Sequence, residues 1–181
     1  MSELKPIGVN IFTIDSFLSS TDCSDFISQA EEFGFKPADV ETGSSRTLMT
    51  NIRNNERVDY ESTELAVKWW SYLSETEIPV IDGMRAVGIS PRFRFYKYTP
   101  GQKFNMHKDG RQNVKGNTTL LTLLVYLNEG YQGGSTKFRQ GEVDVAPAVG
   151  KALIFDHDLW HQGVEVQVGT KYVLRTDVIF E

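Results

Sequence analysis

Apolar residues recur at helical spacing, every three or four positions, in two segments of the first ninety residues. A serine or threonine at 20–21 can cap a helix that continues to Phe33 and stops at Gly34. A second helix is predicted over about Tyr60–Ser74, with Asp59 as its cap. The apolar faces expected for these helices are Phe26, Ile27, Ala30 and Phe33 in the first and Leu65, Trp69, Tyr72 and Leu73 in the second.

From Pro91 onward the pattern changes to short strands separated by turns that contain glycine or proline. Strands spaced this closely are typical of a β-sandwich or a jelly roll. The sequence therefore predicts a mainly β (α+β) protein in one domain, 1–181, with a helical preface and supporting strands in 1–90 and the β core in 91–181. The two helices are expected to pack on one outer face of this core. The predicted strands are Val9–Ile14, Pro91–Tyr98, Thr118–Leu127, Ser135–Phe138, Glu142–Val145, Lys151–Phe155, Trp160–Val166 and Lys171–Phe180.

The last predicted strand has two faces of different character. One face is apolar except for Thr176, and the other carries Lys171, Val173, Arg175, Asp177 and Ile179. A polar face of this kind is usually exposed to solvent. In a jelly roll with a metal in its mouth, the same face would look into the barrel and could hold an anionic cosubstrate. Periodicity alone leaves both interpretations open.

Composition and charge narrow the class of protein. The chain has 181 residues, 40% of them hydrophobic and 12% aromatic, which is typical of a folded globular protein. Its net charge of −5 disfavours nonspecific binding to nucleic acid, which depends on clustered cations. The single cysteine, Cys23, and the lack of a signal-like or membrane-spanning apolar run lead us to expect a cytoplasmic protein. The oligomeric state cannot be read from the sequence.

Two of the three histidines fall in a pattern that suggests a metal site. His107 and Asp109 are separated by one residue, and His161 follows 52 residues later. Two imidazoles and one carboxylate on one face of a metal are the ligands of non-heme Fe(II) oxygenases. Asp109 could also serve only as a turn residue before Gly110, but the metal is the favoured interpretation. The third histidine, His157, lies in a predicted strand and loop, so a structural role close to the site is expected for it.

Three stretches, FRFYKYTPGQKFNMHKDG, LTLLVYLNEGYQGGSTKF and VGKALIFDHDLWHQGVEVQVGTKYVLRTDVIF, resemble the catalytic domain of the prolyl 4-hydroxylase-like, 2-oxoglutarate- and Fe(II)-dependent dioxygenases. The resemblance covers about 91–181 closely, and the segment beginning DSFLSSTDCSDFI resembles the family's N-terminal preface less specifically. It implies a double-stranded β-helix (jelly-roll) core. It also implies Fe(II), 2-oxoglutarate and O2 as cofactor and cosubstrates, with ascorbate as a supporting reductant.

Carried over position by position, the resemblance implies that His107, Asp109 and His161 bind the iron. It implies that Lys171, ten residues after His161, pairs with the distal carboxylate of 2-oxoglutarate. Tyr126 matches a tyrosine that hydrogen-bonds the same carboxylate, and Tyr98 matches a tyrosine that lines the cosubstrate pocket.

The role of Arg175 stays open at this point. It shares a strand face with Lys171 and is a second candidate for the carboxylate anchor or for a substrate contact. An ion pair with Asp177 or Asp109 is an equally good interpretation. Because Asp109 is present, where a related halogenase would have a small residue to admit chloride, hydroxylation is the expected outcome.

The resemblance points to a prolyl residue of a peptide or protein as the substrate, with release of succinate and CO2. Three alternatives stay open: a free amino acid or small metabolite, a nucleic acid, or a non-catalytic 2-oxoglutarate-binding jelly roll. Thr42–Asn55 and Gly110–Asn117 are polar loops expected to contact substrate. For the cations near the predicted iron, ordinary solvated charge is favoured over contact with an acidic substrate; these are Lys97, Lys103, Lys108 and Arg111.

Overall fold

Helices are a minor part of the computed structural model, which describes residues 3–42, 45–47 and 51–181. Within these residues the helices are α1 (Ser20–Phe33), α2 (Thr63–Leu73) and a 3₁₀ turn, η1 (Gln140–Glu142). None of these described helices is long and apolar enough to cross a bilayer.

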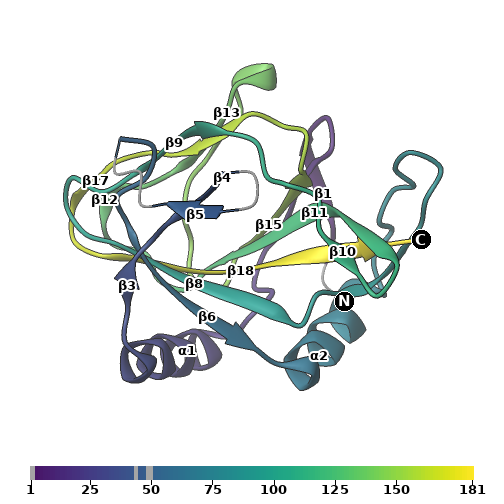
Figure 1. Cartoon of the computed structure of the whole chain (residues 1–181), viewed down its shortest axis with the longest axis horizontal. Helices are drawn as coiled ribbons and strands as arrows, with labels where there is room; N and C mark the ends of the chain where they lie inside the picture. Colours follow the sequence, from purple (N-terminus) through teal and green to yellow (C-terminus); the bar gives the residue numbers. More distant parts are fainter. Residues whose placement is uncertain (1–2, 43–44, 48–50) are drawn as a thin grey trace.

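Most of the strands belong to two antiparallel sheets that lie on either side of an internal cavity (Figure 1). The large sheet has the order β1 (Lys5–Gly8), β2 (Ile11–Ile14), β15 (Ala152–Asp156), β11 (Asn117–Tyr126), β18 (Lys171–Phe180), β8 (Arg92–Tyr98), β6 (Glu56–Glu61) and β3 (Lys36–Pro37), with β10 (Asn113–Val114) beside β11 and β7 (Ala86–Ile89) beside β18. The smaller sheet has the order β14 (Asp144–Val145), β13 (Thr136–Phe138), β16 (His161–Gly163) and β9 (Phe104–His107). Two further pairs are β12 (Gln132–Gly133) with β17 (Val166–Val168) and β4 (Val40–Thr42) with β5 (Ser45–Thr47).

The large sheet has a hydrophobic core on each of its faces. On the side of the helices, which Figure 1 shows below the sheet, Trp69 of α2 packs edge-on against Phe93 of β8, with ring centroids 5.2 Å apart. Between the two sheets, a second cluster includes Tyr98, Tyr126 and Val173. Burial on both faces of the sheet explains why β11 is apolar from Leu120 to Tyr126 except for Thr122.

Both helices start at a serine that differs from the predicted cap. The Ser19 side chain accepts a hydrogen bond from the Asp22 amide at the start of α1, and Gly34, with φ 82°, ends this helix as predicted. The second helix starts later than predicted, at Thr63, with Ser62 as its cap. The predicted start and the cap at Asp59 were wrong because Glu56–Glu61 forms β6, which pairs with β8.

Some helix residues and one strand also differ from the prediction. Phe33 and Tyr72 are 46% and 39% exposed, whereas Leu73, which follows Tyr72 in the same predicted stripe, is fully buried. The predicted strand Trp160–Val166 is divided into β16 and β17, which pair with β13 and β12 respectively. The chain changes partner strand between them, so a continuous strand cannot form.

The polar face of β18 points to the interior between the two sheets and is not exposed to solvent. Lys171 is 2% exposed and Asp177 is 1% exposed, whereas a solvent-facing strand would leave both accessible. The alternating residues Leu174 and Val178 point to the core beside the helices. The face of β18 that looks into the cavity between the sheets is therefore polar because it forms part of a site.

Candidate active site

Strand pairing brings the predicted metal ligands together. His107 ends β9 and His161 begins β16, and these two residues are directly opposite each other in the antiparallel pair. Their imidazole centroids lie 4.3 Å apart. Asp109 follows two residues after His107, and the ligand atoms of all three side chains lie within 4.8 Å of one another. This spacing suits three ligands on one face of a single metal ion.

The two imidazoles are oriented by backbone carbonyls. The Nδ1 atom of His107 lies 2.7 Å from the carbonyl oxygen of Asn105, and Nδ1 of His161 lies 2.9 Å from that of Leu159. An Nδ1–H that donates to a carbonyl leaves the lone pair on Nε2 for a metal. Both Nε2 atoms lie 3.6 Å from the carboxylate oxygens of Asp109, so the free lone pairs and the carboxylate face the same point.

Asp109 is held by two further side chains. The Thr122 hydroxyl donates to Oδ2 at 2.6 Å, and the Arg175 guanidinium lies 3.0 Å from Oδ1. Burial alone would raise the pKa of Asp109, but Arg175 and the two imidazoles outweigh it and hold this pKa well below its usual range. Burial lowers the pKa of His161 to about 4. At neutral pH these groups are an ionised carboxylate and a neutral imidazole, which are the forms that bind metals.

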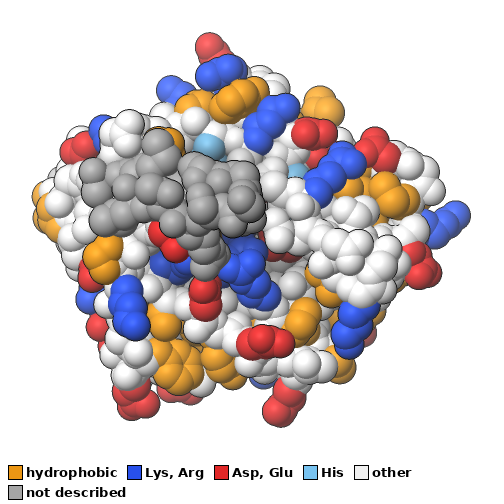
Figure 2. Space-filling model, in the orientation of Figure 1, with side chains coloured by type: hydrophobic (Ala, Val, Ile, Leu, Met, Phe, Trp, Pro, Cys, Tyr) orange, Lys and Arg blue, Asp and Glu red, His pale blue; other side chains and the backbone are white. Residues whose placement is uncertain are grey.

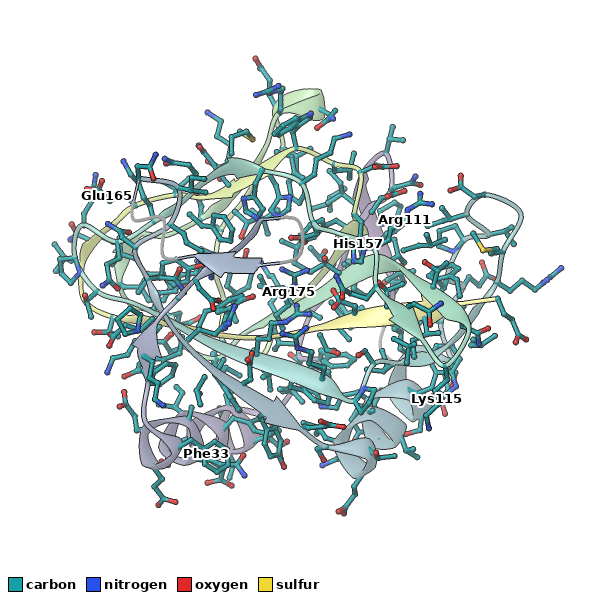
Figure 3. The ribbon with its side chains drawn as sticks, viewed as in Figure 1. Phe33, Arg111, Lys115, His157, Glu165 and Arg175 are labelled. Atoms are coloured by element: carbon teal, nitrogen blue, oxygen red, sulfur yellow. The ribbon has the colours of Figure 1, made fainter. Side chains whose placement is uncertain are left out.

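Behind Asp109 lies a buried charge network centred on Asp177. This carboxylate is 3.1 Å from Arg175, 3.1 Å from Arg94 and 3.3 Å from Nε2 of His157. Figure 3 shows Arg175 near the middle of the molecule, with His157 to one side. Arg175 thus pairs with both carboxylates that the sequence suggested for it. His157 lies behind Asp177, outside the cluster that His107, Asp109 and His161 form.

The inner cavity extends from the histidines to Lys171 and Tyr98, and Tyr126 lies behind its wall; the family resemblance assigned these three residues to the cosubstrate. Lys171 and Tyr98 line this cavity together with His107 and His161, and the hydroxyl of Tyr126 hydrogen-bonds Thr136 on its wall at 2.6 Å. The cavity measures about 30 Å³, room for one or two water molecules. A five-carbon dicarboxylate therefore fits only when the lining side chains adjust.

Lys171 is a buried cation with no counter-ion among the side chains that the structure describes. Its ammonium donates to the carbonyl oxygen of Gly134 at 2.7 Å and lies 4.9 Å from the ring centroid of Tyr98. No carboxylate of the described residues lies within 4.0 Å of it, and burial lowers its pKa to about 7. A cation in this situation is stabilised by an anion entering the cavity. Burial raises the pKa of the Tyr98 and Tyr126 hydroxyls, so both stay protonated donors.

A larger cleft of about 690 Å³ lies outside the histidines. Seven arginines and lysines and only two aspartates of the described residues line it. Figure 2 shows blue side chains gathered at the centre of this face. Burial alone would raise the pKa of Tyr96 in its wall, but four arginines, Arg175 first, outweigh burial and lower this pKa to about 8. No local sequence pattern predicted this cleft, because its arginines come from separate segments of the chain.

The surface cations singled out in the sequence form ion pairs with nearby acidic residues. Lys97 pairs with Glu31 at 2.7 Å, Lys103 lies 3.8 Å from Glu165, and Arg111 lies 2.9 Å from Asp82. Of the two predicted substrate loops, Gly110–Asn117 contributes Gly110, Arg111 and Gln112 to the cleft wall. The loop Thr42–Asn55 lies partly outside the described residues, and its described part contributes Ile52 and Arg53.

Comparison with protein families matches residues 93–176 to the 2OG-Fe(II) oxygenase superfamily. These residues belong to that superfamily. The match spans the strands that carry the histidines, Asp109 and Lys171. Together with the cluster of His107, Asp109 and His161, it identifies Fe(II) and 2-oxoglutarate, with O2, as the cofactor and cosubstrates of the oxygenase.

Solved structures of prolyl hydroxylases have the same fold. A viral collagen prolyl hydroxylase from Paramecium bursaria Chlorella virus-1 is 24% identical, with a TM-score of 0.68 over 95% of this chain and 97% of that one. A prolyl-4-hydroxylase from Pseudomonas putida is 17% identical, with a TM-score of 0.68 and coverage of 94% and 92%. A Trichoplax adhaerens prolyl hydroxylase, in complex with a hypoxia-inducible factor peptide, is 17% identical, with a TM-score of 0.73 and coverage of 94% and 83%. No curated protein sequence matches the chain.

Proposed function

We propose that this oxygenase hydroxylates a prolyl residue of a peptide or protein, at an unactivated C–H bond, with release of succinate and CO2. One observation carries the general reaction. The cluster of His107, Asp109 and His161 and the uncompensated cation of Lys171 lie on the walls of the same cavity. A metal that binds one end of a 2-oxo dicarboxylate and a cation that binds the other require this arrangement.

The iron site would be formed by His107, Asp109 and His161. Their backbone and side-chain partners fix the Nε2 lone pairs and the carboxylate before the metal arrives, which limits the reorganisation needed for binding. Arg175 holds Asp109 in place and keeps it ionised. When bound, Fe(II) with 2-oxoglutarate and O2 supplies the oxidation of the C–H bond.

The cosubstrate would be anchored by Lys171. Its ammonium would exchange the Gly134 carbonyl for the distal carboxylate of 2-oxoglutarate, which is a stronger, charge-assisted partner. Tyr98 and Tyr126 stay protonated and can donate hydrogen bonds to the same carboxylate. The buried aromatic and aliphatic walls, which include Phe155 and Val173, would exclude water from the cavity during the reaction.

Two observations support a prolyl residue as the target. The fold is that of enzymes named prolyl hydroxylases, one of which was solved with a peptide. The outer cleft reaches His107 and Asp109 and has the volume of a typical ligand site, so it can admit part of a polypeptide segment. We also propose that residues 1–181 act as one domain, since β2 pairs with β15 and β6 pairs with β8.

Mass spectrometry of proline-containing peptides tests this proposal. Purified protein with Fe(II), 2-oxoglutarate, O2 and ascorbate is expected to add one oxygen atom to proline and to release one succinate per product. A matched peptide with alanine in place of proline should gain no oxygen, and Asp109→Ala should be inactive with either. Succinate release without any modified proline, across a peptide library, would refute the prolyl assignment and retain the oxygenase.

A further inference from the structure

Arg53 lines the outer cleft as a buried side chain. Its backbone lies beside the proposed iron site. The segment 51–55 runs antiparallel to the start of β9, with a bridge between Arg53 and Phe104. The Asn105 amide donates to the Ile52 carbonyl at 2.9 Å, and the Lys103 amide donates to the Asn54 side chain at 2.8 Å. The position of Arg53 relative to β9 is thus fixed by the backbone.

The guanidinium of Arg53 is also fixed. Its Nε donates to Oδ1 of Asn55, which is 1% exposed, at 3.0 Å. Its central carbon lies 4.1 Å above the Phe104 ring, and this ring stacks on His107 with centroids 3.5 Å apart. The other side of the guanidinium faces Tyr96 at 4.9 Å. The Phe104 ring therefore lies between the guanidinium of Arg53 and His107, one of the proposed iron ligands.

The charge of Arg53 is not compensated. The side chain is 4% exposed, and among the residues whose side chains the structure describes, its Nη2 has no hydrogen-bond partner and no carboxylate lies within 4.0 Å. By contrast, the neighbouring Arg57 pairs with Asp39 at 2.7 Å and Arg94 pairs with Asp177 at 3.1 Å. A buried, unpaired charge is strongly unfavourable, and its retention indicates that an anion completes the site.

We propose that Arg53 binds a carboxylate of the substrate, an inference that rests on the function proposed above. The enzyme would then hydroxylate an acidic substrate at a position close to the substrate's carboxylate. Nε is already bonded to Asn55, and Nη2 is enclosed without a partner among the described residues, so a carboxylate that enters beside Arg53 would be bound by the Nη atoms, whose fork matches its two oxygens. The carboxylate can belong to an Asp or Glu side chain of a peptide or to a small carboxylic acid. The excess of cations along the cleft favours either source.

The test compares each carboxylate probe with its neutral amide. The probes are capped proline peptides with Glu on both sides of the proline, the same peptides with Gln, and free L-proline with L-prolinamide. Succinate release above the rate without probe is measured. Wild type is expected to prefer the acid by about tenfold or more in kcat/KM, as for a charged hydrogen-bonded pair, and Arg53→Gln should reduce the preference to about twofold. If the Glu peptides are preferred over the Gln peptides, the carboxylate belongs to a peptide side chain. If L-proline is preferred over L-prolinamide, it belongs to a small carboxylic acid.

Two controls make the result specific. The acid-to-amide ratio compares two probes on the same protein sample, so a smaller folded fraction in Arg53→Gln does not change it. Arg53→Lys should give an intermediate ratio. Lys137→Gln removes an exposed cation of β13 that does not line the cleft, and should leave the ratio within about twofold. Equal ratios in wild type, equal losses in Arg53→Gln and Lys137→Gln, or no stimulation by any carboxylate would overturn the inference. Wild type that gives no charge-transfer band with Fe(II) and 2-oxoglutarate under anaerobic conditions would instead refute the proposed function.

Discussion

Replacing Lys171 with methionine should stabilise the protein without ligand and remove tight binding of 2-oxoglutarate. In the unfolded chain this lysine keeps its proton up to about pH 10.5, whereas burial lowers the folded-state pKa to about 7. The folded state therefore binds fewer protons, and its stability increases with pH between these two values. At neutral pH the difference corresponds to a cost of roughly 4 kcal/mol in the free energy of folding.

Other contacts of the ammonium offset part of this cost. The hydrogen bond to Gly134 contributes about 1–3 kcal/mol, and the contact with the Tyr98 ring about 1 kcal/mol. Methionine has a similar length and also packs well against aromatic rings. The expected net gain for Lys171→Met is therefore about 0–2 kcal/mol in the free energy of unfolding. For a chain of this size, this raises Tm by up to about 8 °C.

Urea and thermal unfolding of the metal-free protein measure the stability, and calorimetry in the presence of Mn²⁺ in place of Fe(II) measures 2-oxoglutarate binding. Lys137→Met is a matched control, because Lys137 is exposed on β13, and should change stability by less than about 0.5 kcal/mol. Lys171→Met should weaken 2-oxoglutarate binding by at least about 30-fold. A large loss of stability, or wild-type affinity for 2-oxoglutarate, would refute the assignment of Lys171 as an uncompensated anchor.

Three further predictions concern Lys171, the iron ligand Asp109 and the backbone at Gly150. The affinity of the wild type for 2-oxoglutarate should fall above about pH 7, by at most about tenfold per pH unit, because binding must then restore the proton of Lys171. Calorimetry from pH 6 to 9 should show this decrease in affinity, and Lys171→Met should not show it. Asp109→Ala should abolish Fe(II) binding and succinate release, and retained turnover would contradict the proposed ligand set. Gly150→Ala should destabilise by about 2–4 kcal/mol in urea unfolding, because φ is 76° and the new Cβ would lie 2.1 Å from the Leu18 carbonyl oxygen; a loss below about 0.5 kcal/mol would contradict this.

The sequence predicted those elements whose signals are local. The helix Ser20–Phe33 has a capping serine and a terminal glycine, and its end is as predicted. The strand Lys171–Phe180 is long, with one face that is apolar except for Thr176, and its bounds are also as predicted. The orientation of its polar face could not be decided from periodicity, because the other sheet that covers it is built from short strands far away in the chain.

What the sequence did not predict depends on long-range contacts. The predicted second helix began at Tyr60 with Asp59 as its cap, yet these residues belong to the strand β6, because β8 provides a partner edge. Arg53 was part of a predicted substrate loop, but nothing in the local sequence placed it over Phe104. Its importance comes from the absence of a carboxylate around it among the described residues, and this can be seen only in three dimensions.

An anaerobic titration tests the central claim most directly, namely that this cavity binds Fe(II) through His107, Asp109 and His161 and 2-oxoglutarate through the iron and Lys171. Fe(II) and then 2-oxoglutarate are added to the metal-free protein, and the visible metal-to-ligand charge-transfer band is recorded. We predict a band in wild type, no band in His161→Ala, and a band in Lys171→Ala that requires at least about 30-fold more 2-oxoglutarate. Wild-type protein that binds Fe(II) but gives no band at saturating 2-oxoglutarate would contradict the account.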